Sequence, residues 1–208
     1  MRTMSSFRDG TVTATADPTL ESFLSQLAGL HKHLCPRQVL GVRMGMYAAD
    51  LFSLKLPQRG KRLLAFVETD GCFADGIGIA TGCSMGHRTM RLVDHGKIAS
   101  TFVDTQTGRT QRCSASPDAR MRAAACVPEA KSRWQAQLAA YQRMSREELF
   151  QVQEVVLSFD IHAIIAKPGL RTACSTCGEE IVNQREVLIN GQPTCRNCAG
   201  DKYWTLPK

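Results

Sequence analysis

Four cysteines near the C-terminus form two C-x-x-C pairs, Cys174–Cys177 and Cys195–Cys198, separated by seventeen residues. Each pair offers two thiolates from a tight turn, and two such turns supply the four soft ligands of a closed tetrahedral zinc site. Two disulfides are the alternative, but disulfide frameworks belong to oxidising compartments. A redox C-x-x-C motif comes singly at the start of a helix. The spacing therefore predicts one structural zinc bound by all four cysteines.

A second group of potential ligands consists of His31, His33 and Cys35, followed by Pro36. Alternate residues of a straight helix point in divergent directions and cannot bind one ion together. Pro36 disfavours the α conformation at Cys35, so an irregular corner between two helices can aim all three side chains inward. Taken singly, a histidine is usually a satisfied polar group and a buried cysteine a small apolar residue. Their clustering favours a metal site.

Cys72 and Cys83 flank a glycine-rich segment that also contains Asp75. Asp75 follows Cys72 by three residues, so the two side chains can share a helical face. A strand that leads into a glycine-rich helix is a place where free amides stabilise a thiolate. Neither a dinucleotide-binding glycine pattern nor a P-loop lysine is present, so a phosphate cradle is not supported. This segment adds to the case for a second metal site.

The elements expected to position these residues are helices and strands in one domain. Apolar periodicity and capping signals predict helices from Asp17-Pro18 to Leu30, from Pro36 to Phe52, over Cys72–Cys83, from Ser116-Pro117 onward, and behind a capping box at Ser145–Glu148. Gly41 and Gly45 lie four residues apart on the second helix and leave one face as bare backbone. Another element can therefore approach that face closely.

Strands are predicted over Lys61–Thr69, Arg88–Asp94, Lys97–Val103 and Ile161–Lys167, the middle two as a hairpin and the last as a closing strand. Asn190-Gly191 predicts a second hairpin turn, before the last cysteine pair. Pro168-Gly169 breaks the chain. We therefore expect a flexible N-terminus over 1–18, an α+β core of mixed sheet and helices over 19–168, and a small four-cysteine zinc finger over 169–208.

The composition is that of an ordinary globular protein, with 43% hydrophobic residues in a chain of 208. The first residues contain no apolar signal segment, and no apolar run approaches the roughly 20 residues of a membrane span. We therefore expect a cytoplasmic protein that does not enter a membrane. In that compartment the nine cysteines are to be explained as metal ligands, nucleophiles or core residues rather than as disulfides.

The net charge of +7 comes mainly from residues 105–146, which carry eight Lys or Arg against two acids. The residues from 171 onward carry five against four, so the finger itself is nearly neutral. A nucleic-acid groove needs a continuous basic patch with stacking aromatics, and the basic stretch offers Trp134 and Tyr141 alone. A solvated helical face or a subunit contact explains the charge better than nucleic-acid binding.

Motifs in the core resemble those of the FmdE family of formylmethanofuran dehydrogenase-associated proteins, over about residues 20–165. The matching motifs are His31-x-His33-x-Cys35-Pro36, Gly41-x-Arg43-Met44-Gly45, Cys72-x-x-Asp75, Thr81-Gly82-Cys83-Ser84-x-Gly86 and Asp94-His95-Gly96-Lys97. The terminal module is similar to the treble-clef finger that some members carry. Lys32 and Arg37 stand where the family leads us to expect glycine, and His87 where we expect lysine. A bulky Arg37 beside Cys35 would narrow or recharge the site.

The resemblance implies an α+β core, a homodimer and a metal-binding pocket. Carried over position by position, the pocket residues are His31, His33, Cys35, Cys72 and Cys83, with Asp75 nearby. The family takes its name from operons for a molybdenum or tungsten enzyme of one-carbon metabolism, which implies such an oxidoreductase as a partner. That chemistry needs a pterin and iron–sulfur clusters, and the chain has no tandem four-cysteine ferredoxin pattern. The chain cannot be the catalytic component alone.

Three functional hypotheses follow from these residues. In the first, the core site binds zinc, iron or nickel with an open coordination position, serves redox or metal-cofactor metabolism, and is an enzyme if the metal acts as a Lewis acid. In the second, the chain is an interaction or metal-delivery component whose finger docks a larger oxidoreductase. In the third, Cys35 or Cys72 is a nucleophile activated by His31 or His33. Cys35, Cys72 and Asp75 are thus the candidate catalytic residues.

Overall fold

The computed structural model describes residues 19–165, 169–205 and 207. Contacts within the chain divide it into two units, Met1–Val156 and Leu157–Lys208. The expected flexible N-terminus over 1–18 lies outside the described residues, as does the expected boundary at residue 168. The predicted domain limits therefore stay a prediction. Among the described residues, no helix is long and apolar enough to cross a membrane.

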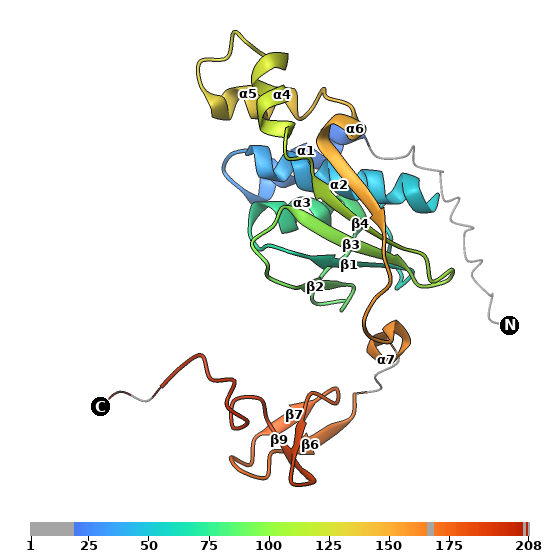
Figure 1. Ribbon diagram of the computed structural model, residues 1–208, viewed down its shortest axis with the longest axis vertical. Helices are drawn as coiled ribbons and strands as arrows, with labels where there is room; N and C mark the ends of the chain where they lie inside the picture. Colours follow the sequence, from blue (N-terminus) through green and yellow to red (C-terminus); the bar gives the residue numbers. More distant parts are fainter. Residues whose placement is uncertain (1–18, 166–168, 206, 208) are drawn as a thin grey trace, which may run out of the picture. The chain divides into compact units, whose positions relative to one another are not determined.

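The first unit is built on a five-stranded mixed sheet, as the sequence predicted for an α+β core (Figure 1). Its strand order is β2-β1-β3-β4-β5. The strands are β1 (Leu63–Val67), β2 (Met90–Leu92), β3 (Ala99–Asp104), β4 (Thr110–Ala115) and β5 (Phe150–Glu154). β1 pairs in parallel with β2, whereas the other neighbouring pairs are antiparallel. Every residue of β1 and β3 is buried, so these strands form the centre of the domain.

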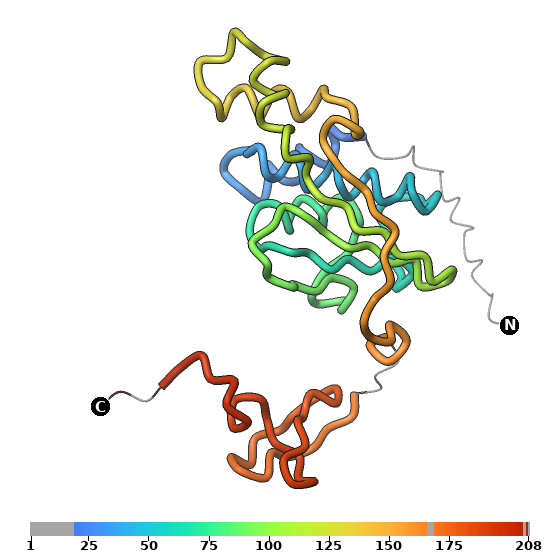
Figure 2. The backbone as a smooth tube through the Cα atoms, viewed as in Figure 1, coloured from blue at the N-terminus to red at the C-terminus, as the bar shows by residue number. Residues whose placement is uncertain are grey.

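Helices from the N-terminal half of the domain pack on this sheet. They are α1 (Leu20–Leu30), α2 (Pro36–Phe52) and α3 (Cys72–Thr81), with bounds close to those predicted. α2 and α3 lie side by side on one face of the sheet, and α1 contacts both helices (Figure 1). The remaining helices are α4 (Ala119–Cys126), α5 (Arg133–Ala140) and α6 (Arg146–Leu149). The segment of α4 and α5, yellow in Figure 2, projects at one end of the domain, where α5 contacts α2.

Glycines bring α2 and α3 into backbone contact. A methyl group added at Gly41 would collide with the carbonyl oxygen of Phe73, and one at Gly76 would lie 2.5 Å from the carbonyl oxygen of Gln38. A methyl group at Gly45 would lie 2.9 Å from the Ala80 side chain. Only glycine permits so close a crossing of two helices. The start of α3 is thereby held against the start of α2.

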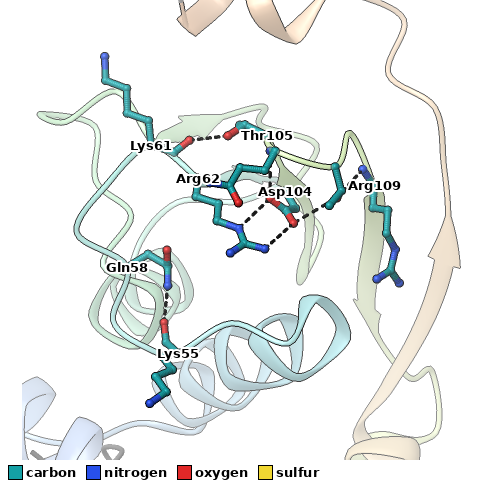
Figure 3. Close-up of polar contacts among 9 residues, drawn as sticks. Lys55, Gln58, Lys61, Arg62, Asp104, Thr105 and Arg109 are labelled. Carbon is teal, nitrogen blue, oxygen red and sulfur yellow. Dashed lines mark hydrogen bonds and ion pairs between the residues drawn. The ribbon is translucent and has the colours of Figure 1, made fainter. Parts of the chain in front are cut away.

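Arg62, at the entrance to β1, forms an ion pair with the buried side chain of Asp104 at the end of β3 (Figure 3). Both distances between guanidinium nitrogens and carboxylate oxygens are 3.1 Å. Asp104 also accepts hydrogen bonds from the Gln106 amide and the Thr107 hydroxyl. The guanidinium of Arg62 holds the pKa of Asp104 below its usual value. This bidentate contact fixes the ends of two central strands.

The predicted hairpin of Arg88–Asp94 with Lys97–Val103 is wrong. The two segments do contain β2 and β3, but β1 lies between them in the sheet. β1, α3 and β2 instead form a β-α-β crossover, with Ala65 opposite Met90. The fully buried β1 needs hydrogen-bonding partners on both edges, and β2 and β3 each supply one. Short sequence separation indicated the wrong neighbour.

Two further expectations differ from the structure. The capping box at Ser145–Glu148 is present, but α6 ends at Leu149 and the chain continues as β5, which places Phe150 and Val152 on one face by period-two alternation. The closing strand expected over Ile161–Lys167 is instead the short helix α7 (Ile161–Ile165), and residues 166 and 167 lie outside the described part of the chain. β4 was not predicted at all.

The second unit contains two small hairpins. β6 (Arg171–Ala173) pairs with β7 (Glu180–Val182), and β8 (Val187–Ile189) pairs with β9 (Gln192–Thr194). Asn190 and Gly191 both have positive φ angles in the turn between β8 and β9, which confirms the predicted hairpin. The C-x-x-C pairs follow β6 and β9 directly. The unit is a small four-cysteine finger.

Candidate metal centres

The four finger cysteines form a metal centre whose geometry fits zinc. Their sulfur atoms all lie within 4.8 Å of one another. The Cys177 and Cys195 sulfurs are 3.9 Å apart, close to the edge of about 3.8 Å expected for a tetrahedron with Zn–S bonds of about 2.3 Å. Cys174 and Cys177 come from the turn between β6 and β7, and the other pair follows β9. The two turns therefore supply a closed tetrahedral ligand set.

Backbone amides prepare these sulfurs for a cation. The Cys195 amide donates to the Cys174 sulfur at 3.2 Å, and this contact contributes most to lowering the pKa of Cys174 to about 6. The pKa of Cys198 is raised to about 12, chiefly by hydrogen bonding to the side chain of Cys195. Crowded thiols resist ionising together because their negative charges repel. Zinc displaces the remaining protons when it binds.

The second centre contains a pair of thiols at the starts of two helices. Cys35 is the N-cap of α2, where its amide donates to the Gln38 side chain at 2.7 Å. Cys72 is the first residue of α3, and its side chain is hydrogen-bonded to that of Cys35. Burial raises the pKa of Cys72, and the Cys35 contact raises it further. The two thiols are therefore held in contact in their protonated forms.

An imidazole and a carboxylate lie next to this pair. His31 is the C-cap of α1, and its Nε2 atom is 2.9 Å from Oδ2 of Asp75. Asp75 follows Cys72 by one turn of α3, close enough for its charge to raise the pKa of Cys72. The end of α1 and the starts of α2 and α3 thus meet in one corner. We call His31, Cys35, Cys72 and Asp75 the thiol corner.

The structure does not bring all of the expected core ligands together. His33 is exposed and makes none of the contacts of the thiol corner. Cys83 follows the C-cap of α3, about 15 Å along the helix from Cys72 at about 1.5 Å per residue. Its buried sulfur is 3.4 Å from the Leu63 carbonyl oxygen, and burial raises its pKa. Within the described residues, only the finger cysteines form a group of three or more converging ligands.

The thiol corner opens onto a cavity of about 600 Å³ that both Cys35 and Cys72 line. Its other walls include residues that sequence reasoning did not assign to the site. They include Arg37 on α2, Arg120 on α4, and Trp134 and Tyr141 from the α5 segment. A separate cavity of about 510 Å³ contains Cys83 and Asp75. The α4 and α5 residues lie far along the chain from Cys35, so no spacing pattern could have indicated them.

Comparison with protein families identifies both units. The family model described as "FmdE, Molybdenum formylmethanofuran dehydrogenase operon" matches residues 30–151. The model described as "Prokaryotic dksA/traR C4-type zinc finger" matches residues 168–203. The second match agrees with the ligand geometry and supports a structural zinc in the finger.

Individual relatives give a consistent but more limited likeness. The crystal structure of a tungsten formylmethanofuran dehydrogenase FmdE-like protein from Syntrophus aciditrophicus has a TM-score of 0.54 and 20% identity, covering 89% of this chain and 95% of that one. That similarity shows the fold. A "Probable S-adenosyl-L-methionine-binding protein" from Archaeoglobus fulgidus is 34% identical over 93 residues, which are 43% of this chain. The chain spans only 25% of the length of that relative.

Proposed function

The chain belongs to the FmdE family, and on that premise we propose that its core domain binds a transition metal at the thiol corner. Cys35, Cys72 and His31 are the ligands in this proposal, with Asp75 as an orienting carboxylate or a fourth ligand. One observation carries it: two thiols in contact lie beside an imidazole–carboxylate pair, at the wall of a cavity. Such a donor set is expensive to bury unless it serves a ligand.

The ligand types define the chemistry that this site supports. Thiolate and imidazole groups suit zinc, iron or nickel. Three protein ligands leave one coordination position, and a metal bound there supplies Lewis-acid chemistry. Asp75 fixes the orientation of the His31 ring through the 2.9 Å contact, as a carboxylate does for many metal-binding histidines. Cys35 and Cys72 form the floor of the cavity where a small molecule would meet the metal.

In this proposal the finger is a structural element and the thiol corner is the functional centre. The family description names a molybdenum formylmethanofuran dehydrogenase operon, which supports a role beside such an oxidoreductase. A redox or metal-cofactor role, a homodimer and a cytoplasmic location belong to the same proposal. Light scattering of the purified protein tests the dimer, and co-purification with the oxidoreductase tests the partner.

A dithiol enzyme is a second candidate, because the Cys35 and Cys72 side chains are already in hydrogen-bond contact. One feature opposes the version in which Cys72 is a nucleophile. Its pKa is raised by burial, whereas an activated thiol has a lowered pKa. His31 also faces Asp75 at hydrogen-bond distance. The metal site therefore accounts for more of the corner.

Metal content per chain separates these two candidates. We expect a second metal in addition to the finger zinc, and we expect Cys72→Ser and His31→Ala each to remove it while the zinc stays. Cys126→Ser is the matched control, because Cys126 is an exposed cysteine on α4. The proposal is wrong if the unmodified protein holds only the finger zinc. A Cys35–Cys72 disulfide in that protein would then favour the dithiol enzyme.

A further inference from the structure

We propose that the cavity beside Cys35 and Cys72 binds a small organic anion, whose charged group is held by Arg37 and Arg120 and whose flat, apolar body lies against Trp134. This inference rests on the function proposed above and deepens it, because it names the class of molecule that reaches the thiol corner. The charged group is a carboxylate or a phosphate, which have the same requirement for guanidinium donors.

The cavity has the size and walls of a small-molecule site. Its volume of about 600 Å³ falls within the range of about 300–1,000 Å³ found for ligand pockets. Apolar wall residues come from α2, the start of β3, the end of β4 and the start of α4: Leu40, Ile98, Ala115, Pro117 and Ala119. A few polar groups interrupt these walls. That combination is typical of a site for a partly apolar ligand.

The charged residues of the wall are of one sign. Arg37 and Arg120 line the cavity, and no Asp or Glu is among its lining residues. Elsewhere in the core domain, Arg62 pairs with a buried carboxylate, as does Arg112. Neither Arg37 nor Arg120 forms an ion pair with any residue that the structure describes. Uncompensated guanidinium groups around a concave surface attract anions and bind them in bidentate fashion.

Tyr141 gives an independent indication of a ligand. Its side chain lines the cavity and is 2% exposed. Its backbone carbonyl accepts from Arg43, but its hydroxyl forms no hydrogen bond with any described residue. Burial raises the pKa of Tyr141, and the nearby charge of Arg120 acts in the opposite direction, so a neutral O–H donor lies near that guanidinium. Buried polar groups seldom lack a partner, and a ligand oxygen would supply one.

Trp134 determines the shape of the ligand body. Its ring belongs to α5, lines the same cavity and is 48% exposed, although large aromatic side chains are usually buried. A flat organic group stacked on this ring would cover the exposed surface. Arg37 stands where the family resemblance leads us to expect glycine. The anion site is therefore a property of this chain, added beside the shared thiol corner.

Benzoate, phenyl phosphate and neutral benzamide are matched probes for this site. Their binding to the full-length protein is measured by fluorescence of Trp134 in a Trp204→Phe background, because Trp204 is the other tryptophan. We expect a dissociation constant of about 1 mM or tighter for an anionic probe. Benzamide should bind about tenfold more weakly, since charge-assisted hydrogen bonds are lost. The tighter of the two anions identifies carboxylate or phosphate as the preferred group.

Arginine variants locate the site. Arg37→Ala and Arg120→Ala should each weaken binding of the anionic probe about tenfold and leave benzamide within about twofold. Arg122→Ala is the control, because Arg122 lies on the same helix as Arg120, is absent from the wall and faces Asp118 at 3.7 Å. It should change binding by less than about twofold.

The inference is overturned if neither anion binds at about 10 mM, if benzamide binds as tightly, or if Arg122→Ala weakens binding as much as Arg120→Ala. Metal content of the same variants keeps the two proposals apart. Arg37→Ala and Arg120→Ala should retain every metal that the unmodified protein holds. If the unmodified protein holds only the finger zinc, the metal proposal fails, and the anion titration still decides the anion site.

Discussion

The finger and the thiol corner assemble their side chains in opposite ways. The finger takes four identical ligands from one short segment, and its sulfur atoms already converge within 4.8 Å. The corner takes four different groups from the ends of three helices, and they form two contacting pairs. A site of the first kind is defined by its local turns. A site of the second kind exists only because helices pack against one another.

The two units also differ in what stabilises them. The core domain encloses a large apolar cluster that includes Phe23, Met44, Phe73, Ile77 and Phe102. In the finger, Cys174 and Ile181 are the buried apolar residues among those described. A unit with so small a core depends on its metal for folding, whereas the core domain does not. The metal of the finger is thus structural, and any metal of the corner is available for chemistry.

Loss of a finger ligand gives the largest expected effect. Cys195→Ser should remove the zinc and unfold the finger, because zinc binding contributes about 10 kcal/mol or more to the folding of such modules. The core domain should keep its melting temperature. Metal analysis and limited proteolysis check this, with new cleavage expected within residues 169–205. A finger that resists protease after complete removal of zinc would contradict the structural role assigned to the metal.

Crowding the helix contact should affect the corner and spare the finger. Gly41→Ala places a methyl group against the Phe73 carbonyl oxygen, so α2 and α3 must separate. We expect a loss of about 1–3 kcal/mol in unfolding free energy and a lower content of the second metal. Gly29→Ala in α1 is the control, because its added methyl meets nothing within 4 Å. That change should stabilise by about 0.5–1 kcal/mol.

Calorimetry and metal analysis on both glycine variants measure these effects. Unchanged stability of Gly41→Ala would mean that the two helices can separate without cost, and the close backbone packing would then not explain how the thiols are brought together. Unchanged metal content in a clearly destabilised Gly41→Ala variant would instead show that the corner tolerates movement of α3. The finger zinc should stay at its original content in both variants.

Acid should empty the corner before it empties the finger. Both centres need ionised thiols, so protons compete with the metal at each. The pKa of Cys72 is raised by burial, whereas that of Cys174 is lowered to about 6, and the corner also has fewer sulfur ligands. We expect half-loss of the second metal about one pH unit above half-loss of the zinc. Dialysis at a series of pH values with metal analysis tests the order; simultaneous release would contradict it.

Local signals in the sequence were sufficient for the finger and for much of the helical part. Cysteine spacing and Asn190-Gly191 indicated the zinc site and its second hairpin, and apolar periodicity located α1, α2 and α3. The sheet order was missed because pairing of β1 with both β2 and β3 depends on distant segments. Strands that are neighbours in sequence are not always neighbours in the sheet.

The corner could be predicted only in part, for the same reason. The family resemblance grouped five core ligands, but it could not show that α3 places Cys72 and Cys83 at opposite ends. The contact of His31 with Asp75 depends on how α1 meets α3, which no spacing reveals. Arg120 and Trp134 reach the cavity through α4 and α5, which follow most of the sheet in the chain. Tertiary packing decides each of these contacts.

The smallest expected effect concerns nucleic acid, and it compares the basic stretch of residues 105–146 with the nearly neutral finger. Three of its eight basic side chains face carboxylates, since Arg112 pairs with Glu68, Arg122 with Asp118 and Arg146 with Asp50. Phosphate binding needs free cations along one continuous surface, and it weakens steeply with salt as counterions are released. We therefore expect no binding of duplex DNA or single-stranded RNA tighter than about 10 µM at physiological salt. Fluorescence titration at low and physiological salt measures this. Tight, strongly salt-dependent binding would make the basic stretch a nucleic-acid surface rather than the neighbourhood of a small-anion cavity.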